Sequence, residues 1–341
     1  MQLPWPYGRL KLTSHAIHCT LCLYYLTRNT NYIPLSESCP FKLKIAMTDR
    51  DSPTILHIAA RFFRSNRQHL FGWSLNTAMC CFIAARGAPP LWPSLAAVIS
   101  TAFLTFSVYV YNDILDAGQD RQSPIKKERP IPTGEASEKV ARALTCVTAF
   151  IGLMIVLFVN KYSFLFAFIG WFLSMIYSHR GVFLKSRFII KELTVTLALP
   201  ATGLVGVYAA TGAFSLEAFM AMLVWSFFLF LAQPVVTDAV DVEQDRWAGV
   251  QTLATRTNWN TRILLLLIGV TGVLVSVPVI YVYLDFNLLL PGIGIPVTLA
   301  FLVYLLLTRQ GIKDNPVRAR NISLLFFIIL QLAFVFGSLR I

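Results

Sequence analysis

Nine long apolar runs constrain the fold of this chain more than any other feature of its sequence. A helix needs about 20 predominantly apolar residues to cross a bilayer. The runs lie at residues 69–87, 91–112, 140–159, 163–178, 189–210, 216–237, 263–284, 287–307 and 322–339. Hydrophobic residues make up 56% of the chain and charged residues 13%, against about 25% charged residues in a typical soluble domain. We therefore predict an all-α fold, a polytopic membrane bundle of nine transmembrane helices.

The basic residues are distributed unevenly between the two sides of the predicted bundle. Of 29 lysines and arginines, only Arg86, Lys161 and Arg340 lie on the side that the odd-numbered spans lead to. Cytoplasmic loops carry an excess of Lys and Arg. The basic side is therefore predicted to be cytoplasmic. Most of the basic residues behind the net charge of +12 thus lie on the predicted cytoplasmic side of a membrane protein, and the charge does not indicate a nucleic-acid partner.

Acidic residues are scarce, but six of the 17 fall in two short segments with the same spacing. The segments follow the second and the sixth span, and both read D-x-x-D-x-x-x-D-R. The first cluster is Asp113, Asp116 and Asp120, and the second is Asp238, Asp241 and Asp245. Residues at i, i+3 and i+7 share one helical face, so each triplet is predicted to point in one direction. Both clusters are expected on the cytoplasmic side.

Carboxylates this close together repel one another unless cations compensate them. Mg²⁺ binds through one or two carboxylates, waters and substrate phosphates, so two facing clusters predict a site for a diphosphate bridged by Mg²⁺. Neighbouring loops supply further cations for a diphosphate, namely Arg121, Lys126, Lys127, Arg129, Lys185, Lys191 and Arg246. The alternative is that all these charges are solvated residues at the membrane interface. The matched spacing on one side favours the diphosphate site.

The sequence around the clusters extends the pattern. With Asn112, the first cluster reads N-D-x-x-D-x-x-x-D and continues to R-P-I-P-T-G at residues 129–134; the second continues as R-W-A-G-V-Q-T-L at residues 246–253. Over residues 55–341 the chain resembles the UbiA superfamily of intramembrane prenyltransferases. The resemblance implies nine transmembrane helices, and it implies that both Asp clusters, together with Asn112, bind Mg²⁺ and the diphosphate. It also implies that Tyr177, Lys185 and Asn76 lie near the diphosphate.

The function implied by the resemblance is that of a Mg²⁺-dependent membrane prenyltransferase. Such an enzyme ionises an allylic prenyl diphosphate donor and transfers the prenyl group to an acceptor. The R-P-I-P-T-G continuation favours an aromatic, pyrone-like or lipid acceptor of specialised metabolism over a respiratory-quinone role. Two alternatives stay open: a terpene cyclase of the same superfamily acting on farnesyl or geranylgeranyl diphosphate, and a non-catalytic lipid-binding protein or transporter. The intact first motif favours the transferase.

Aromatic residues on the spans that carry the clusters are candidates to stabilise an allylic cation through their π faces. These residues are Phe103, Phe106, Tyr109, Phe227, Phe228 and Phe230.

Residues 1–46 match no part of the resemblance. Residues 1–54 are predicted to form an N-terminal extension, either a targeting segment or the result of a mis-assigned start. The prenyltransferase-like transmembrane domain is predicted at residues 55–341.

Overall fold

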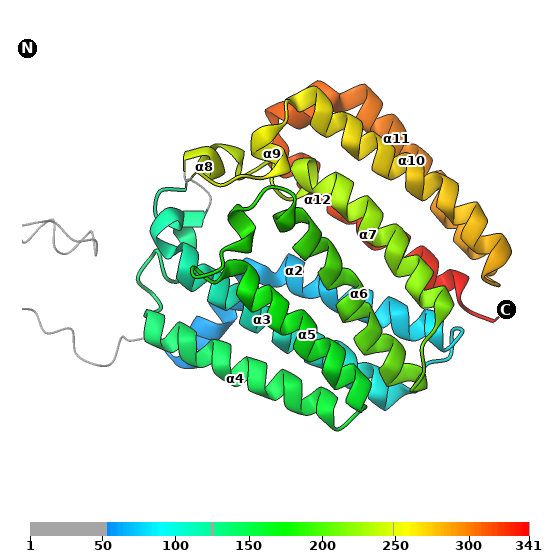
Figure 1. Ribbon diagram of the computed structural model, residues 1–341, viewed down its shortest axis with the longest axis horizontal. Coiled ribbons are helices and arrows are strands. Elements are labelled where there is room, and N and C mark those ends of the chain that lie inside the picture. The colour runs from blue at the N-terminus through cyan, green and yellow to red at the C-terminus, as the bar shows by residue number, and fades with distance from the viewer. Residues whose placement is uncertain (1–52, 124–125, 248, 341) are drawn as a thin grey trace, which may run out of the picture. The chain divides into compact units, whose positions relative to one another are not determined.

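The computed structural model describes residues 53–123, 126–247 and 249–340, and this part of the chain is a bundle of helices without strands (Figure 1). The α-helices are α2 (Ile55–Ala84), α3 (Leu91–Asp120), α4 (Glu138–Leu157), α5 (Lys161–Ser178), α6 (Ile190–Thr211), α7 (Leu216–Val236), α8 (Val242–Trp247), α9 (Leu253–Arg256), α10 (Trp259–Tyr283), α11 (Leu289–Asp314) and α12 (Pro316–Gly337). Two 3₁₀ helices, η1 (Lys126–Glu128) and η2 (Leu184–Ser186), lie in loops. The predicted extension, residues 1–54, lies outside the described residues except for its last two.

The all-α prediction is confirmed for the described residues, whereas the count of nine spans is not. Seven helices are long and apolar enough to cross a membrane, namely α3, α4, α6, α7, α10, α11 and α12. The other two long helices are α2 and α5. The first half of α2 carries Arg61, Arg64 and Arg67, and α5 has only 18 residues, among them Lys161. The charged side chains lower the mean hydropathy of both helices.

Two helices extend well beyond the apolar runs that predicted them. Helix α2 begins at Ile55 and not near residue 69, and the side chain of Thr54 caps it by accepting a hydrogen bond from the backbone N–H of His57 at 3.2 Å. Helix α3 continues past residue 112 to Asp120. Helical hydrogen bonds are made by the backbone, so a polar turn can continue a helix whose apolar run has ended.

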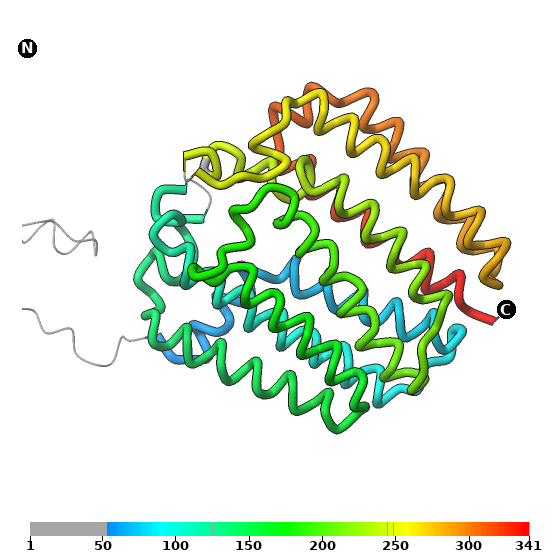
Figure 2. The backbone as a smooth tube through the Cα atoms, in the orientation of Figure 1, coloured from blue at the N-terminus to red at the C-terminus, as the bar shows by residue number. Residues whose placement is uncertain are grey.

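The long helices pack as two groups. Helices α2 to α6 contact one another, and α7, α10, α11 and α12 form the second group, as the smooth trace makes clear (Figure 2). Contacts of α6 with α7 and of α2 with α12 join the groups. All described loops that follow the Asp clusters, together with α8 and α9, lie at one end of the bundle (Figure 1). The fold therefore brings the two clusters to the same end.

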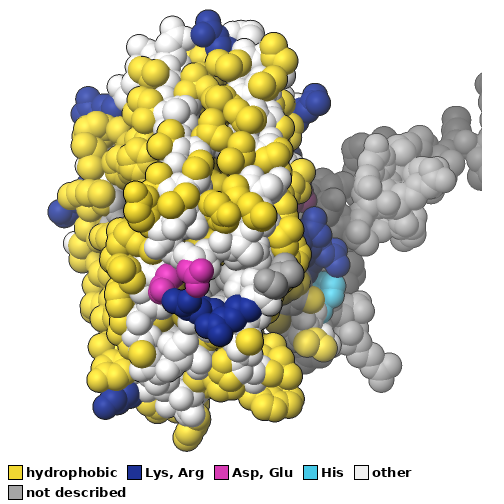
Figure 3. Space-filling model, turned by 90° about the vertical axis from the view of Figure 1, so that its right-hand side faces the viewer, with side chains coloured by type: hydrophobic (Ala, Val, Ile, Leu, Met, Phe, Trp, Pro, Cys, Tyr) yellow, Lys and Arg dark blue, Asp and Glu magenta, His cyan; other side chains and the backbone are white. Residues whose placement is uncertain are grey.

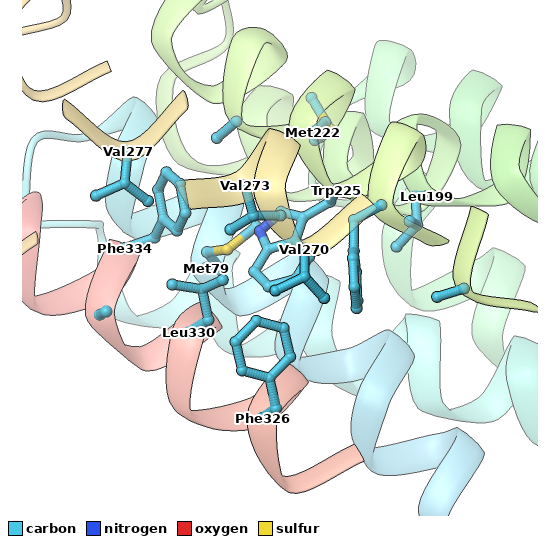
Figure 4. Close-up of a cluster of buried hydrophobic side chains, with 14 of the residues drawn as sticks. Met79, Leu199, Met222, Trp225, Val270, Val273, Val277, Phe326, Leu330 and Phe334 are labelled. Carbon is cyan, nitrogen blue, oxygen red and sulfur yellow. The ribbon is translucent and has the colours of Figure 1, made fainter. Parts of the chain in front are cut away.

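Buried side chains of α2, α6, α7, α10, α11 and α12 form the largest hydrophobic core (Figure 4). Trp225 lies at its centre, with its ring centroid 4.6 Å from that of Phe327. Small residues let the helices approach closely: a Cβ on Gly206 of α6 would come within 2.3 Å of the carbonyl oxygen of Thr77 in α2. Small residues at such crossings are typical of helices that pack inside a membrane.

The surface of the described bundle carries many exposed large hydrophobic side chains, including Phe150, Leu197, Leu264 and Val303. In the view of Figure 3, hydrophobic side chains cover most of the surface, and acidic side chains gather beside Lys or Arg at one place. Apolar surface on this scale is typical of a protein whose surroundings are lipid. Together with the seven apolar helices it indicates an integral membrane protein.

Candidate active site

The first Asp cluster lies on the last turns of α3. Because the helix continues to Asp120, the i, i+3, i+7 spacing places the three carboxylates on one side of it, as the sequence predicted. The side chains of Asp113 and Asp120 are each only 1% exposed, and that of Asp116 is 18% exposed. Two carboxylates are thus removed from water at the end of a membrane helix, which requires compensating cations.

Arg129 supplies the main compensation in this cluster. Its guanidinium Nη1 lies 2.7 Å from Oδ1 of Asp113 and 3.0 Å from Oδ2 of Asp120. The segment after η1 turns back on α3, and a hydrogen bond from the hydroxyl of Thr133 to the carbonyl of Arg129 holds this turn at 3.0 Å. Burial alone lowers the pKa of Arg129, but the carboxylates of Asp113 and Asp120 outweigh it and hold that pKa above its ordinary value.

The third carboxylate of the first cluster, Asp116, is held from two directions. Lys185 of η2 forms an ion pair with its Oδ1, and the side-chain amide of Asn112 donates to its Oδ2 at 2.9 Å. Asn112 in turn accepts a hydrogen bond from the hydroxyl of Ser178 at the end of α5, at 2.8 Å. The end of α5 and the η2 loop therefore complete the first cluster.

The second cluster does not lie on one continuous helix, contrary to the prediction from its spacing. Helix α7 ends at Val236, a turn contains Asp238 and Asp241, and Asp245 belongs to the separate helix α8. Pro234 lies in the last turn of α7, where it lacks the N–H that would continue the hydrogen-bond ladder. The same sequence spacing therefore produces a bent segment here and a straight helix in α3.

Lys191, at the start of α6, compensates the second cluster. Its Nζ lies 2.8 Å from Oδ1 of Asp238 and 4.0 Å from Oδ2 of Asp245. Burial raises the pKa of Asp245 to about 6, and the negative charges of Asp238 and Asp241 add to this effect, while Lys191 opposes it. A carboxylate with such a pKa gains from any additional cation placed beside it.

An ion pair between Lys126 and Asp241 joins the two clusters. Lys126 follows the first cluster in the sequence, Asp241 belongs to the second, and the two are 115 residues apart along the chain. Lys126 Nζ lies 2.8 Å from Oδ2 of Asp241. The two Asp clusters are therefore neighbours, and their lysines and arginine lie between and around them.

The clusters retain capacity for a further cation, although their carboxylates pair with basic side chains. Across the ranges that the structure describes, no three His, Cys, Asp or Glu side chains converge as a ready metal site. However, Oδ2 of Asp238 is buried and has no hydrogen-bond partner within those ranges. Oδ1 of Asn66, in α2, is likewise buried without a hydrogen-bond partner in those ranges, and the amide nitrogen of the same side chain donates to Asp113. Mg²⁺ binds oxygen ligands, and these two buried oxygens have no hydrogen bond among the described residues that a cation would have to replace.

Asn66 is a site residue that the sequence analysis missed. Its amide nitrogen lies 3.2 Å from Oδ2 of Asp113. Asn76, which the resemblance placed near the diphosphate, instead donates to the carbonyl of Leu199 at 3.0 Å and to the hydroxyl of Thr202 at 2.9 Å, both in α6. The first apolar run began at residue 69, so Asn66 fell outside the predicted span.

The remaining predicted residues occupy different positions around the clusters. Tyr177 lies in the last turn of α5, next to Ser178, whose hydroxyl donates to Asn112 of the first cluster. Arg121, Lys127 and Arg246 have exposed side chains, and none of them forms an ion pair with another described residue. These three are therefore available to solvent or to a bound anion.

The aromatic candidates divide by position. Tyr109 lies one turn before Asp113 on α3, and its ring stacks on that of His69 with the centroids 4.3 Å apart and the planes at 15°. Phe106 and Phe228 are buried in hydrophobic clusters, whereas Phe227 is 49% exposed on the surface of α7. Phe103 and Phe230 are half-buried. Of the six, Tyr109 lies nearest to the first cluster along the chain, four residues before Asp113 on α3.

Comparison with known proteins gives relatives with named activities. The model of the UbiA prenyltransferase family matches residues 74–330. The chain is 30% identical to a digeranylgeranylglyceryl phosphate synthase of Sulfolobus acidocaldarius, over 68% of this chain and 81% of that protein. It is 25% identical to a 4-hydroxybenzoate octaprenyltransferase of Francisella tularensis subsp. mediasiatica, over 77% of this chain and 91% of that protein.

Solved structures show the same fold. A UbiA homologue from Archaeoglobus fulgidus bound to DMAPP and Mg²⁺ has a TM-score of 0.67 at 17% identity, covering 82% of this chain and 97% of that chain. The apo structure of a UbiA homologue from Aeropyrum pernix has a TM-score of 0.65 at 19% identity, covering 78% of this chain and 96% of that chain.

Proposed function

The chain belongs to the UbiA prenyltransferase family and is a prenyltransferase, and from this premise we propose how it works. We propose that both Asp clusters bind one prenyl diphosphate through Mg²⁺ and ionise it, with the active site on the cytoplasmic side. The prenyl group then passes to a small-molecule or lipid acceptor. The proposal rests above all on the 2.8 Å ion pair between Lys126 and Asp241, because this pair joins two clusters that are distant in sequence.

The residues of the site fit Mg²⁺. Six carboxylates and two asparagine amides supply hard oxygen donors, and Oδ2 of Asp238 and Oδ1 of Asn66 are buried oxygens that lack partners among the described residues. In the proposed complex the two Asp clusters and Asn112 hold the metal. When bound, Mg²⁺ supplies positive charge to the diphosphate oxygens on which negative charge accumulates. The structure of the Archaeoglobus fulgidus homologue, bound to DMAPP and Mg²⁺, supports this assignment.

Basic side chains of the site are proposed to bind the diphosphate directly. Lys126, Arg129 and Lys185 now pair with carboxylates, and each can exchange a carboxylate oxygen for a phosphate oxygen when a donor enters. Charge placed in advance where a leaving group develops its charge lowers the barrier to departure. The C1–O bond of the donor then breaks, and both electrons leave with the diphosphate. The nucleophilic atom of the acceptor bonds to C1, and its proton passes to the departing diphosphate.

The bundle is proposed to protect the allylic cation from water. Beyond the first cluster, α2 and α3 continue into the apolar part of the bundle, where Leu70, Phe106 and Val110 are buried. A dry site prevents capture of a reactive cation by water. The ring of Tyr109, which stacks on His69 one turn from Asp113, is proposed to contact the first carbons of the prenyl chain and to stabilise positive charge there.

The acceptor class is drawn from the relatives. Their names indicate a glyceryl phosphate lipid in one case and an aromatic acid in the other. We propose that this chain takes an acceptor of one of these two kinds, or a pyrone-like ring of similar chemistry. The exposed apolar surface of the bundle is compatible with entry of both prenyl donor and lipid acceptor from the membrane.

The proposal is tested by product analysis with the full-length protein in proteoliposomes. Geranyl, farnesyl and geranylgeranyl diphosphate are supplied in turn with Mg²⁺, with and without 4-hydroxybenzoate, a 4-hydroxy-2-pyrone or a prenylglyceryl phosphate. We expect diphosphate release together with a prenylated acceptor. Asp113→Asn and Asp241→Asn are each expected to reduce turnover by about 100-fold or more, the scale of losing a group that stabilises transition-state charge.

The matched control is Asp314→Asn, because Asp314 is an exposed carboxylate at the end of α11 and takes part in neither cluster. It is expected to retain wild-type turnover. A cyclic terpene formed from the donor alone would show a cyclase instead of a transferase. Equal turnover of wild type and both cluster variants would contradict the proposed site.

A further inference from the structure

A cavity of about 460 Å³ opens on the surface between η2 and the segment that leads into α9. Ser186, Arg187 and Phe188 line it from the first segment, and Gln251 and Arg256 line it from the second. The backbone N–H of Gln251 donates to the carbonyl of Ser186 at 3.1 Å, so the two segments meet at the cavity. Its volume lies in the range of small-molecule sites. The lining residues include no aspartate of either cluster and no basic residue that pairs with one, so this cavity is distinct from the diphosphate site.

The cavity carries positive charge without a matching negative charge. Arg187 and Arg256 are both exposed, and within the described ranges neither forms an ion pair. A guanidinium matches a phosphate with two parallel hydrogen bonds. Two such side chains lining one cavity therefore favour a phosphate group as its occupant.

Gln251 gives an independent indication of a ligand. Its Oε1 is buried and has no hydrogen-bond partner among the described residues. A buried acceptor without a partner is costly, and a ligand that brings a hydrogen-bond donor removes that cost. The occupant is therefore expected to carry a hydroxyl or a similar donor beside its phosphate.

An apolar strip runs from the cavity along one face of α6. Phe188, which lines the cavity just before this helix, is 44% exposed, and Ile190, Leu193 and Leu197 are 40%, 45% and 58% exposed. The spacing i, i+3, i+7 places the last three on one face of the helix. Because α6 is long and apolar enough to cross a membrane, this exposed face is expected to contact acyl chains. A charged cavity at the end of a lipid-facing strip has the two parts that a phospholipid requires.

From these features we propose that the cavity binds the headgroup of an anionic phospholipid from the leaflet at this end of the bundle, while one acyl chain follows the strip of α6. Arg187 and Arg256 pair with the phosphate, and Gln251 accepts a hydrogen bond from a headgroup hydroxyl. This lipid is neither the donor nor the acceptor of the prenyl group and is not consumed. Phosphatidylcholine is disfavoured, because its headgroup has no net charge and brings no hydrogen-bond donor to Gln251.

The test is equilibrium binding of short-chain phospholipids to the detergent-solubilised full chain, in EDTA and without a prenyl donor. Dihexanoyl phosphatidylglycerol is the anionic probe, dihexanoyl phosphatidylcholine is the neutral probe, and glycerol 3-phosphate is a soluble anion without acyl chains. We expect phosphatidylglycerol to bind about 10- to 30-fold more tightly than either of the other two, the scale of two basic residues at a membrane surface. Equal binding of phosphatidylcholine would overturn the anion site, and equal binding of glycerol 3-phosphate would overturn its assignment to a lipid.

Variants assign the preference to the cavity. The double variant Arg187→Ala, Arg256→Ala is expected to lose the preference for phosphatidylglycerol over phosphatidylcholine. The double variant Arg309→Ala, Arg318→Ala is the matched control, because it removes the same charge from two exposed arginines of α11 and α12, and it is expected to keep the preference. Equal losses in the two double variants would show a general effect of net charge and would contradict the site.

A last arm separates this site from the diphosphate site. The titration is repeated with Mg²⁺ and saturating farnesyl thiolodiphosphate, and the affinity for phosphatidylglycerol is expected to stay the same. Displacement of the lipid by the donor analogue would place it in the active site and overturn the proposal. Because binding is measured without turnover, the lipid site can fail while the prenyltransferase function stands, and the reverse also holds.

Discussion

Removal of the Arg129 guanidinium is the perturbation whose effect can be worked out most fully. In Arg129→Ala, Asp113 and Asp120 face each other without the cation that lies 2.7 Å and 3.0 Å from them. Both carboxylate side chains are only 1% exposed, and breaking a buried ion pair by deleting one partner costs about 3–5 kcal/mol. Asp113 keeps its hydrogen bond from Asn66, and the Arg129 side chain is 19% exposed, so the lower end of that range applies.

A loss of about 3 kcal/mol corresponds to a decrease in Tm of about 6–12 °C, at about 2–4 °C per kcal/mol for large domains. The assay is thermal unfolding of the detergent-solubilised protein followed by circular dichroism, first in EDTA and then in Mg²⁺. Mg²⁺ is expected to raise the Tm of Arg129→Ala more than that of the wild type. In the variant the metal binds carboxylates that no guanidinium occupies, and a ligand that binds the folded state more tightly stabilises it more.

The matched control is Arg61→Ala. Arg61 forms an ion pair with Glu135 at 2.7 Å, but these side chains are 29% and 35% exposed. Pairs this open to solvent contribute at most about 1 kcal/mol, so the Tm should decrease by only a few degrees and should not respond to Mg²⁺. Equal decreases in the two variants, or an equal response to Mg²⁺ in Arg129→Ala and wild type, would refute the reasoning.

Three further predictions follow from the same contacts. Asn66→Ala should reduce turnover by about tenfold, the scale of one hydrogen bond to a charged group. Asn76→Ala should lower the Tm with little change in turnover, because the partners of Asn76 lie in α6. A turnover loss confined to Asn76→Ala would show the assignment to be wrong. Gly206→Ala should destabilise the bundle by about 1–3 kcal/mol in an unfolding assay, because the added Cβ would meet the Thr77 carbonyl oxygen at 2.3 Å. Gly72→Ala is the control: an added Cβ there has nothing within 4 Å, so this variant should be neutral or slightly stabilising. Equal Tm values for the two variants would count against the close packing of α2 and α6. Chelation of Mg²⁺ by EDTA should abolish diphosphate release, and added Mg²⁺ should restore it; release that continues in EDTA would exclude the proposed metal requirement.

The sequence predicted most of the helices because each apolar run is long enough to be read alone. Their ends were predicted less well, since hydropathy reports lipid contact whereas a helix ends where its backbone hydrogen bonds end. Helix α3 is the clearest case: its apolar run stops near residue 112, but the helix continues to Asp120 and carries the whole first cluster. The helical spacing of the aspartates was the better guide there.

The limits of spacing appear in the second cluster. Its three aspartates have the same spacing as the first, but Pro234 and the turn at Asp238 place them on a bent segment. Contacts between distant elements were beyond prediction from one sequence. The Lys126–Asp241 pair spans 115 residues, and Asn66 reaches Asp113 only because α2 begins at Ile55. The sequence thus predicted which acidic and basic residues lie together, whereas the partners of each carboxylate depend on how α2, α3, α6 and α7 pack.

The central claim is that the two Asp clusters form one metal–diphosphate site. Its most direct test is binding of Mn²⁺, an EPR-active substitute for Mg²⁺, to wild type, Asp113→Asn, Asp241→Asn and the double variant, with and without farnesyl thiolodiphosphate. A single site predicts that the donor analogue strengthens metal binding in the wild type and that either single substitution removes most of this gain, so that the double variant loses little more. The claim would be contradicted if each single variant kept the full gain in metal affinity at its unchanged cluster, so that the two clusters contributed independently.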